Sequence, residues 1–196
     1  MNPKAPTTAA GPRIAIERPE AFAPGDIADL CDAAETAIVD GGGFGWLRPP
    51  PRSLMERYWK GVLLVPEREL WIGRLDGRIA GAAQLVLPPR NNEAQALIAT
   101  VTMNFTAPWA RGHGLARALH LALEESARRH GLWFINLDVR ETQLAAIALY
   151  ESLGYRRWGT NPNYAVVQGR AIAGHYYTRA LRGPKKGRAR KEREEK

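Results

Sequence analysis

Cysteine is almost absent from this sequence: Cys31 is the only one among 196 residues. A single cysteine excludes an internal disulfide framework and suits a reducing compartment, so we expect a cytoplasmic protein. Cys31 falls on the apolar face of a predicted helix, where it is expected to be a small buried residue rather than a nucleophile. The four histidines are scattered and offer no metal-ligand spacing, and we therefore expect no bound metal.

Long hydrophobic runs are also missing. No apolar stretch approaches the length of a membrane span, and the first residues lack the apolar segment of a signal peptide, so we expect no membrane partner. Hydrophobic residues make up 45% of the chain and charged residues 24%, which is ordinary for a globular protein. A chain of this length suits one domain with a substantial core.

The excess of positive charge is concentrated at one end. The net charge is +8, but residues 182–196 hold eight basic and three acidic residues and so carry +5 of it. Such a tail is usually mobile and solvated, and we expect no nucleic-acid binding except through it. Residues 1–12 are rich in Pro, Ala and Thr and are predicted to be disordered. Residues 13–181 remain as the folded domain.

Periodicity and turn signals predict the order of the elements. Asp26 is expected to N-cap the first helix, and Ser53 with Glu56 to form a capping box at the second. The strands before and after the third helix should run parallel, because a helix connects them. The predicted helices cover 26–39, 53–64, 115–130 and 142–153, and the predicted strands cover 13–18, 69–75, 78–87, 94–106, 133–139, 155–167 and 170–181.

The stretch 101–116, VTMNFTAPWARGHGLA, joins a strand to a helix through a glycine turn. Gly112 and Gly114 allow the main chain to approach a ligand closely. The first N–H groups of the helix lack internal partners and its dipole is positive there, so a phosphate or pyrophosphate is the natural ligand. The alternative interpretation is a tight strand-to-helix turn without a ligand.

Two other phosphate-binding motifs fit this turn less well. A Walker loop needs Lys and then Ser or Thr after its last glycine, where this chain has Leu115 and Ala116. A dinucleotide fingerprint needs Gly or Ala at the position of Arg117. Asp138 does lie at about the distance of a ribose-binding acid, but such a fingerprint usually opens its domain, and this turn lies past mid-chain.

What fits is Arg111-x-x-Gly114-x-Ala116, preceded by Pro108. This pattern resembles the acetyl-CoA-binding motif of the GNAT superfamily of N-acetyltransferases. Downstream, residues 148–155, ALYESLGY, resemble the second signature of that family, L-Y-x-x-L-G-[FY]. The resemblance implies the α/β GNAT fold: a mixed central sheet with splayed parallel central strands, flanking helices, and the pantetheine arm in the gap between those strands.

A closer resemblance rests on less specific elements. Residues 40–43, DGGG, then a proline run, residues 58–62, YWKGV, and Gly159-x-x-Pro162-x-Tyr164 are similar to the tabtoxin-resistance type of GNAT acetyltransferase. That resemblance would cover about residues 25–181. Each element is equally compatible with an ordinary loop, core aromatic residue or turn.

The resemblance implies acetyl-CoA as the acetyl donor and indicates its contacts. The turn backbone and Arg111 would hold the pyrophosphate, while His113 is expected to be exposed. The strand edge around Asn104 would pair with pantetheine amides, and a backbone N–H there would stabilise the carbonyl oxygen. Gln143 stands where the family often has Asn. The expected cofactor-binding residues are Met103, Phe105, Thr106, Arg111, Gly112, His113, Gly114, Leu115, Ala116, Gln143 and Tyr150.

The proton chemistry is assigned to three candidates, Tyr150, Asp138 and Asn104. Tyr150 matches the family tyrosine near the thioester sulfur, so its hydroxyl is expected to protonate the leaving thiolate; the alternative is a core tyrosine. Asp138 is the first choice for the base, since positions 99–103 carry no acid, but it could instead cap the next helix or pair with Arg140. Asn104 would orient the acceptor or a water, or be a hydrogen-bonded strand residue. The alternatives for the base are Glu141, Glu93 and a water held by Thr100, Thr102 or Asn104.

The implied function is acetyl transfer from acetyl-CoA, by direct attack, to the amine of a small molecule such as an amino-acid-like metabolite, a toxin or an antibiotic. One alternative is an acyl-CoA-binding sensor or a ribosome- or RNA-associated partner without turnover. Another is a protein N-acetyltransferase. A homodimer is left open.

Overall fold

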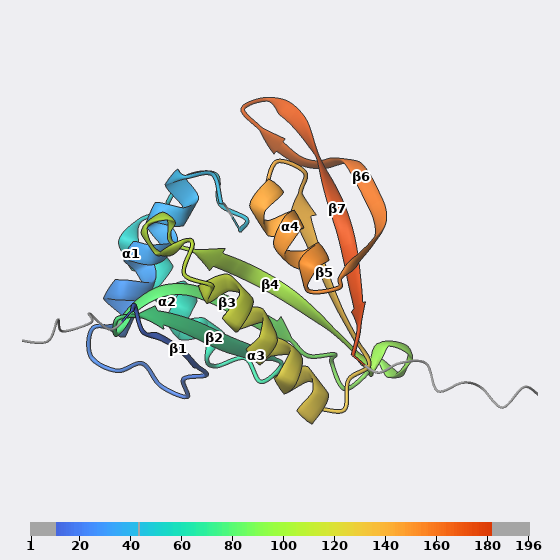
Figure 1. Ribbon diagram of the computed structural model, residues 1–196, viewed down its shortest axis with the longest axis horizontal. Coiled ribbons are helices and arrows are strands. Elements are labelled where there is room, and N and C mark those ends of the chain that lie inside the picture. The colour runs from blue at the N-terminus through green and yellow to red at the C-terminus, as the bar shows by residue number, and fades with distance from the viewer. Residues whose placement is uncertain (1–10, 43, 182–196) are drawn as a thin grey trace, which may run out of the picture.

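A seven-stranded mixed sheet runs through the structure, a computed structural model that describes residues 11–42 and 44–181 (Figure 1). Its strand order is β1-β2-β3-β4-β5-β7-β6, and only β4 and β5 pair in parallel. The expectations for residues 1–10 and 182–196 lie outside the described residues. The strands are β1 (Ile14–Glu17), β2 (Arg68–Leu75), β3 (Arg78–Val86), β4 (Ile98–Thr106), β5 (Phe134–Arg140), β6 (Arg156–Val167) and β7 (Arg170–Ala180).

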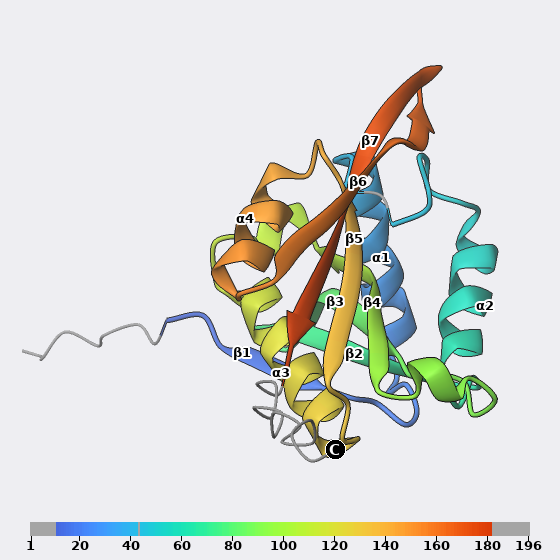
Figure 2. The same cartoon turned by 90° about the vertical axis from the view of Figure 1, so that its right-hand side faces the viewer.

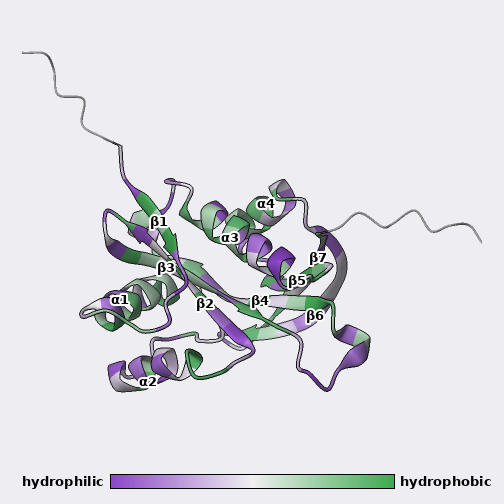
Figure 3. Ribbon diagram, turned by 90° about the horizontal axis from the view of Figure 1, so that it is seen from below, coloured by the Kyte–Doolittle hydropathy of each residue, from purple (hydrophilic) through white to green (hydrophobic). Residues whose placement is uncertain are grey.

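Helices cover both faces of the sheet, as Figures 2 and 3 show. Helices α1 (Asp26–Val39) and α2 (Arg52–Val62) lie on one face, and α3 (Leu115–Arg129) and α4 (Leu144–Ser152) lie on the other. Each face has its own apolar core, because successive strand residues point to opposite sides. Trp59 is fully buried in the first core, and Leu119 in the second. The mixed α/β fold expected from the sequence is confirmed.

The bounds of α1 match the prediction, but Asp26 is not its N-cap. Gly25 occupies that position with a left-handed φ of 89°. The Asp26 carboxylate instead accepts a hydrogen bond from the Ala23 N–H (3.0 Å) and pairs with the Arg74 guanidinium (2.9 Å). The Asp26 carboxylate, which was expected to cap the helix, is thus bound by Arg74 of β2.

The expected capping box of α2 is also wrong. Pro51 precedes the helix, and Ser53 lies within it and makes no capping hydrogen bond. Glu56 pairs with Arg52 in the first turn (3.5 Å), one turn away along the helix. Because proline fixes φ in the range a helix start needs, the chain can enter the helix here without a side-chain cap.

Two further boundaries differ from the predictions. β4 begins at Ile98 rather than at residue 94, because Glu93–Gln95 form a short 3-10 turn. The Asn92 side chain accepts from the Gln95 N–H (3.3 Å) and so stabilises that turn rather than a strand. Likewise α4 begins at Leu144 rather than at residue 142, and Gln143 precedes it without a side-chain cap.

The parallel strands β4 and β5 separate after a short paired stretch (Figure 1). Their ladder joins residues 98–100 to residues 134–136 and then stops. β4 continues beside β3 as far as Thr106, and β5 continues beside β7 as far as Arg140. The splayed central strands that the resemblance implied are therefore present, and the sheet is open between its two halves.

Within the described residues, no helix has the length and apolar character needed to cross a membrane. In the same part of the chain, no cluster of three or more His, Cys, Asp or Glu side chains is arranged to hold a metal ion. Cys31 is buried, as predicted, and burial raises the pKa of its thiol to about 11.

Candidate active site

A cavity of about 510 Å³ lies where β4 and β5 separate. Segments far apart in the sequence form its walls: the connection between α1 and α2, the middle of β4, the end of β5, the start of α4, and β6. Among the residues predicted for the site, those that line it are Met103, Asn104, Asp138, Gln143 and Tyr150. The fold thus brings the three candidates for proton transfer to one cavity.

A β-bulge shapes the β4 wall of this cavity. Ala82 pairs with Phe105 and Gln84 with Thr102, so the β4 segment contains one residue more than the β3 segment opposite. Met103 absorbs the extra residue with a left-handed φ of 50°. A bulge interrupts the ladder and re-aims the side chains around it. Met103 packs with the core on the α1–α2 face, whereas the Asn104 side chain reaches Tyr150 on the α4 side.

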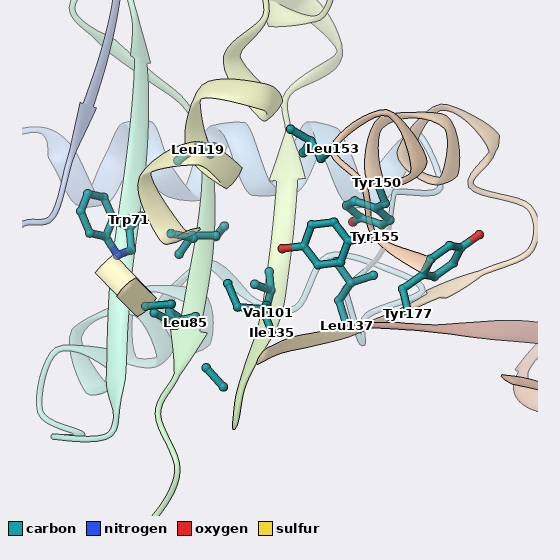
Figure 4. Packing of buried hydrophobic residues seen from close by; sticks show 14 of the residues in the cluster. Trp71, Leu85, Val101, Leu119, Ile135, Leu137, Tyr150, Leu153, Tyr155 and Tyr177 are labelled. Atoms are coloured by element: carbon teal, nitrogen blue, oxygen red, sulfur yellow. The ribbon is translucent and has the colours of Figure 1, made fainter. Parts of the chain in front are cut away.

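Asn104 is hydrogen-bonded to two buried rings. Its amide nitrogen donates to the Tyr150 hydroxyl (3.0 Å) and lies 2.8 Å from Nε2 of His120. Tyr150 and His120 pack against each other and against Tyr155. Figure 4 shows the Tyr150 and Tyr155 rings side by side between α4 and the strands. Since Asn104 supplies a hydrogen atom to the Tyr150 oxygen, the hydroxyl proton of Tyr150 is free to point elsewhere.

Burial sets the protonation of both rings. It raises the pKa of the Tyr150 hydroxyl, against the opposing effect of the Asn104 hydrogen bond, so Tyr150 stays protonated at neutral pH. Burial lowers the pKa of His120 to about 4, so the imidazole is neutral. A protonated tyrosine whose oxygen accepts from the neutral Asn104 amide can release a proton but does not serve as a base.

Asp138 meets a partner that the sequence analysis did not assign to it. The Tyr164 hydroxyl, on β6, donates a hydrogen bond to its carboxylate. Burial and this hydrogen bond raise the pKa of Tyr164, which therefore remains a donor. Neither alternative structural role of Asp138 is seen, since α4 begins without a side-chain cap and no ion pair joins Asp138 to Arg140 in the described residues.

The other candidates for the base lie elsewhere. Glu141 accepts a hydrogen bond from the Ala173 N–H (3.3 Å), and Glu93 belongs to the 3-10 turn before β4. Neither side chain lines the cavity, and nor does Thr100. Of the residues named in connection with the base, Asp138, Thr102 and Asn104 do line the cavity.

The glycine turn stands at the start of α3. Gly112 and Gly114 have φ of 83° and 81°, and a Cβ at either would meet no atom within 4 Å. The first backbone bond into the helix runs from the Ala118 N–H to the Gly114 carbonyl (3.0 Å), so the three residues between them have N–H groups without helical acceptors. This turn fits a pyrophosphate, because open space adjoins donors at the positive end of a helix. The Leu115 side chain is buried, so only its backbone is available.

Two predicted contact residues already have protein partners. The Arg111 guanidinium, half exposed, pairs with Asp40 (2.7 Å), which follows α1. The Gln143 amide donates to the Gly41 carbonyl (2.8 Å), and Arg140 donates to the same oxygen (2.9 Å). These bonds join the α1–α2 connection to the end of β5 across the opening of the sheet. His113 is exposed, as expected, and the Phe105 ring is buried in the α1–α2 core.

Sequence reasoning missed two parts of this site. His120 matches no motif, and its contact with Asn104 exists only because α3 packs on β4. The aromatic wall formed by Phe44 and Trp46 lies in a segment that the sequence showed only as a loop. Tyr164 did belong to a recognised pattern, but nothing in its spacing pointed to Asp138.

A cavity between splayed parallel strands, beside a glycine turn that fits a pyrophosphate, is the arrangement expected of an acyl-CoA-dependent acyltransferase. The family model of the acetyltransferase (GNAT) family matches residues 31–155. The chain belongs to this family and is an acetyl-CoA-dependent N-acetyltransferase.

Individual relatives agree with this assignment. An uncharacterised N-acetyltransferase encoded in the hisH-hisA intergenic region of Azospirillum brasilense is 64% identical over 130 residues, which are 66% of this chain and 77% of that protein. The N-acetylaspartate synthetase of Rattus norvegicus is 31% identical over 96 residues, which are 49% of this chain but 30% of the rat protein. The structure of yncA from Salmonella typhimurium, solved with its cofactor acetyl-CoA, has a TM-score of 0.70 at 19% identity and covers 86% of this chain and 94% of that one.

Proposed function

We propose that this enzyme transfers the acetyl group of acetyl-CoA directly to the primary amine of a small molecule. One observation carries the proposal: a single cavity holds a protonated tyrosine, Tyr150, and a carboxylate, Asp138. Direct transfer needs both, because the attacking amine loses a proton and the departing thiolate gains one. The name of the rat relative gives an N-acetylated amino acid, which supports a small amine as acceptor.

Tyr150 is the proposed acid. Acetyl-CoA supplies a thioester, whose C–S bond breaks as the amine nitrogen forms its bond to the carbonyl carbon. The Tyr150 proton is available for the sulfur, since Asn104 occupies the hydroxyl oxygen as a donor. Asn104 is the residue that positions this hydroxyl, and Nε2 of His120 contacts the Asn104 amide nitrogen.

Asp138 is the proposed base, with a water held by Thr102 or Asn104 as its alternative. An alkylammonium group has a reference pKa near ~10.4, so it must lose a proton before attack. A carboxylate at the cavity wall would first attract the ammonium and then accept its proton. Tyr164 fixes the orientation of this carboxylate through its hydrogen bond.

The glycine turn is the proposed site for the pyrophosphate of the donor. The N–H groups of residues 112–116 would bind the phosphate oxygens, and Arg111 would add a cation if it leaves Asp40. The bulge at Met103 interrupts the hydrogen-bond ladder between β3 and β4 beside the cavity. This interruption supports a backbone contact from β4 to the pantetheine arm or to the carbonyl oxygen.

We also propose the tabtoxin-resistance type as the subfamily. Tyr164, from one of the elements of that resemblance, lines the cavity, and residues 41–42 from another lie at its opening. These placements support a shared acceptor site.

A thiol-release assay against a panel of small amines, with mass spectrometry of the products, tests the proposal. At least one small primary amine should release CoA and gain an acetyl group, and Tyr150→Phe should slow that reaction. Transfer confined to peptides or proteins would point to a protein N-acetyltransferase. Saturable acetyl-CoA binding without transfer to any acceptor would contradict the proposal.

A further inference from the structure

A second cavity, of about 570 Å³, lies between α2 and β4 on the α1–α2 face of the sheet. Thr102 and Met103 line both this cavity and the cavity at the strand opening. The aromatic residues of the two cavities also touch, since Trp46 of the first meets Tyr58 of the second edge to face (5.3 Å between ring centroids). The second cavity is therefore the neighbour of the active site at the β4 bulge.

The polar groups of this cavity are all able to donate hydrogen bonds to an anion. Arg57 and Arg68 contribute two guanidinium groups, and no Asp or Glu among the described residues lines the cavity. Neither arginine forms an ion pair within the described part of the chain, whereas Arg52 and Arg74 each pair with carboxylates. Two cations without a carboxylate partner, facing one cavity, favour a negatively charged ligand.

A buried glutamine holds two donors of this cavity, Arg68 and Tyr58, in place. Arg68 donates to the Gln84 side-chain oxygen (2.8 Å), and the Gln84 amide donates to the Tyr58 hydroxyl oxygen (2.8 Å). Gln84 is fully buried on β3, opposite Thr102. Because the Tyr58 oxygen already accepts a hydrogen bond, its own proton is left to donate. Burial raises the pKa of Tyr58, so the hydroxyl keeps that proton.

Apart from Thr102, the rest of the lining is apolar. Val62 and Val65 come from the end of α2 and the segment after it, and Gly61 adds no side chain to this part of the lining. An apolar lining with a few directed donors selects a ligand that has an apolar body and one charged end. A carboxylate matches the fork of donors on a planar guanidinium group.

We propose that this cavity, defined by Arg57, Arg68 and Tyr58, is an acceptor subsite for a carboxylate, so that the substrate is an amine that also carries a carboxylate on an apolar chain. The amine end would lie at Asp138 in the first cavity, and the chain would cross β4 at Met103. This inference rests on the proposed transfer to a small amine and adds the charge and shape of the acceptor.

Binding is tested first, without turnover. Hexanoate and its uncharged counterpart hexanamide are titrated calorimetrically into the protein and into Arg57→Gln, with Arg170→Gln as the control because Arg170 is an exposed arginine at the start of β7. We expect hexanoate to bind more tightly than hexanamide, and Arg57→Gln to weaken hexanoate about ten-fold while the control does not. Equal binding of the two probes, or an equal effect of both substitutions, would overturn the subsite.

Turnover is tested second, with ω-amino acids of increasing chain length and their amides as matched acceptors. Over one range of chain lengths, the ω-amino acid should have a higher kcat/KM than its amide. Arg57→Gln should remove this difference by raising KM for the acid, with little change in kcat. Acetylation of amides and acids at equal rates would end the inference and leave the proposed function standing. Arginine-dependent hexanoate binding without transfer to any small amine would leave the subsite standing and end the proposed function.

Discussion

Asn104 donates a hydrogen bond to the Tyr150 hydroxyl across 3.0 Å, from a strand to a helix 46 residues further along the chain. The bond fixes where the tyrosine proton can go, because it occupies the oxygen with a donor. It exists because Asn104 follows the β4 bulge, where the strand re-aims its side chains. The bulge and the catalytic proposal are therefore linked through one amide group.

Tyr150→Phe should lower kcat about a hundred-fold and leave acetyl-CoA affinity almost unchanged. The substitution removes one hydroxyl while the ring still packs, and general acid help is typically worth about a hundred-fold or more. Steady-state kinetics and titration calorimetry measure the two quantities. Tyr155→Phe is the matched control, since Tyr155 is buried in the same cluster and its hydroxyl has no hydrogen-bond partner among the described residues. A Tyr150→Phe enzyme as fast as this control would refute the acid role.

Asp138→Asn should remove the acidic limb of the pH profile of kcat/KM. Without a carboxylate to take the proton, activity should recover at high pH as the amine deprotonates by itself. Tyr164→Phe is the comparison, since it removes only the hydroxyl that orients the carboxylate. Its profile should keep an acidic limb. If Asp138→Asn keeps that limb as well, the base is a water held by Thr102 or Asn104.

Gly114→Ala should weaken acetyl-CoA binding at least ten-fold. The added methyl group would lie in the open space at the start of α3, where the pyrophosphate is proposed to bind. The change also strains a left-handed residue, at a cost of about 1 kcal/mol in stability. Gly131→Ala carries the same strain, because Gly131 has φ of 74° and equally open space at the other end of α3. Calorimetry should show wild-type affinity for Gly131→Ala; matching losses in both variants would argue against the phosphate site.

Much of the fold follows from local signals, but only part of the site does. The hairpin turns at Asp76 and Gln168 have the left-handed φ of 51° that two-residue turns require, and both were placed correctly by their glycine partners. The cap at Asp26 failed because Arg74, from β2, binds its carboxylate. The capping box at Ser53 failed because Arg52, in the first turn of the same helix, pairs with Glu56. A pattern within a segment cannot register a partner that another segment supplies.

The same limit explains the candidate site. Tyr150 and the glycine turn belong to motifs with fixed spacing, so they could be found without a structure. The contacts of His120 with Asn104, and of Tyr164 with Asp138, span 16 and 26 residues and arise only when helices and strands pack. The two arginines of the second cavity come from α2 and β2 and share no pattern at all.

Glu69→Gln should destabilise the protein at neutral pH and flatten its loss of stability in acid. Burial tends to raise the pKa of Glu69, but hydrogen bonds from Ser126, His130 and Trp71 outweigh it and lower that pKa from 4.5. A lowered carboxylate pKa adds stability above pH 4.5, and this contribution disappears as the pH falls further.

Chemical denaturation at pH 7 and at pH 4 measures the effect. At pH 7 the variant should lose about 1–3 kcal/mol, the cost of removing charge-assisted hydrogen bonds from a buried group. Glu125→Gln is the control, because Glu125 is exposed and its ion pairs among the described residues are with exposed arginines on the same helix, so it should change stability little. Equal stability of Glu69→Gln and this control at pH 7 would contradict the expectation.

The opening between β4 and β5 links the stability of the protein in a cell to its ligand. The two halves of the sheet share the ladder at residues 98–100 and then separate, so a ligand that fills the opening contacts both halves and binds the folded chain alone. Binding of that kind adds about 2.7 kcal/mol of stability when the free ligand is at a hundred times its dissociation constant. Proteases act on the unfolded fraction, so scarcity of the acetyl donor would shorten the half-life of the enzyme, and its abundance would follow the supply of the donor.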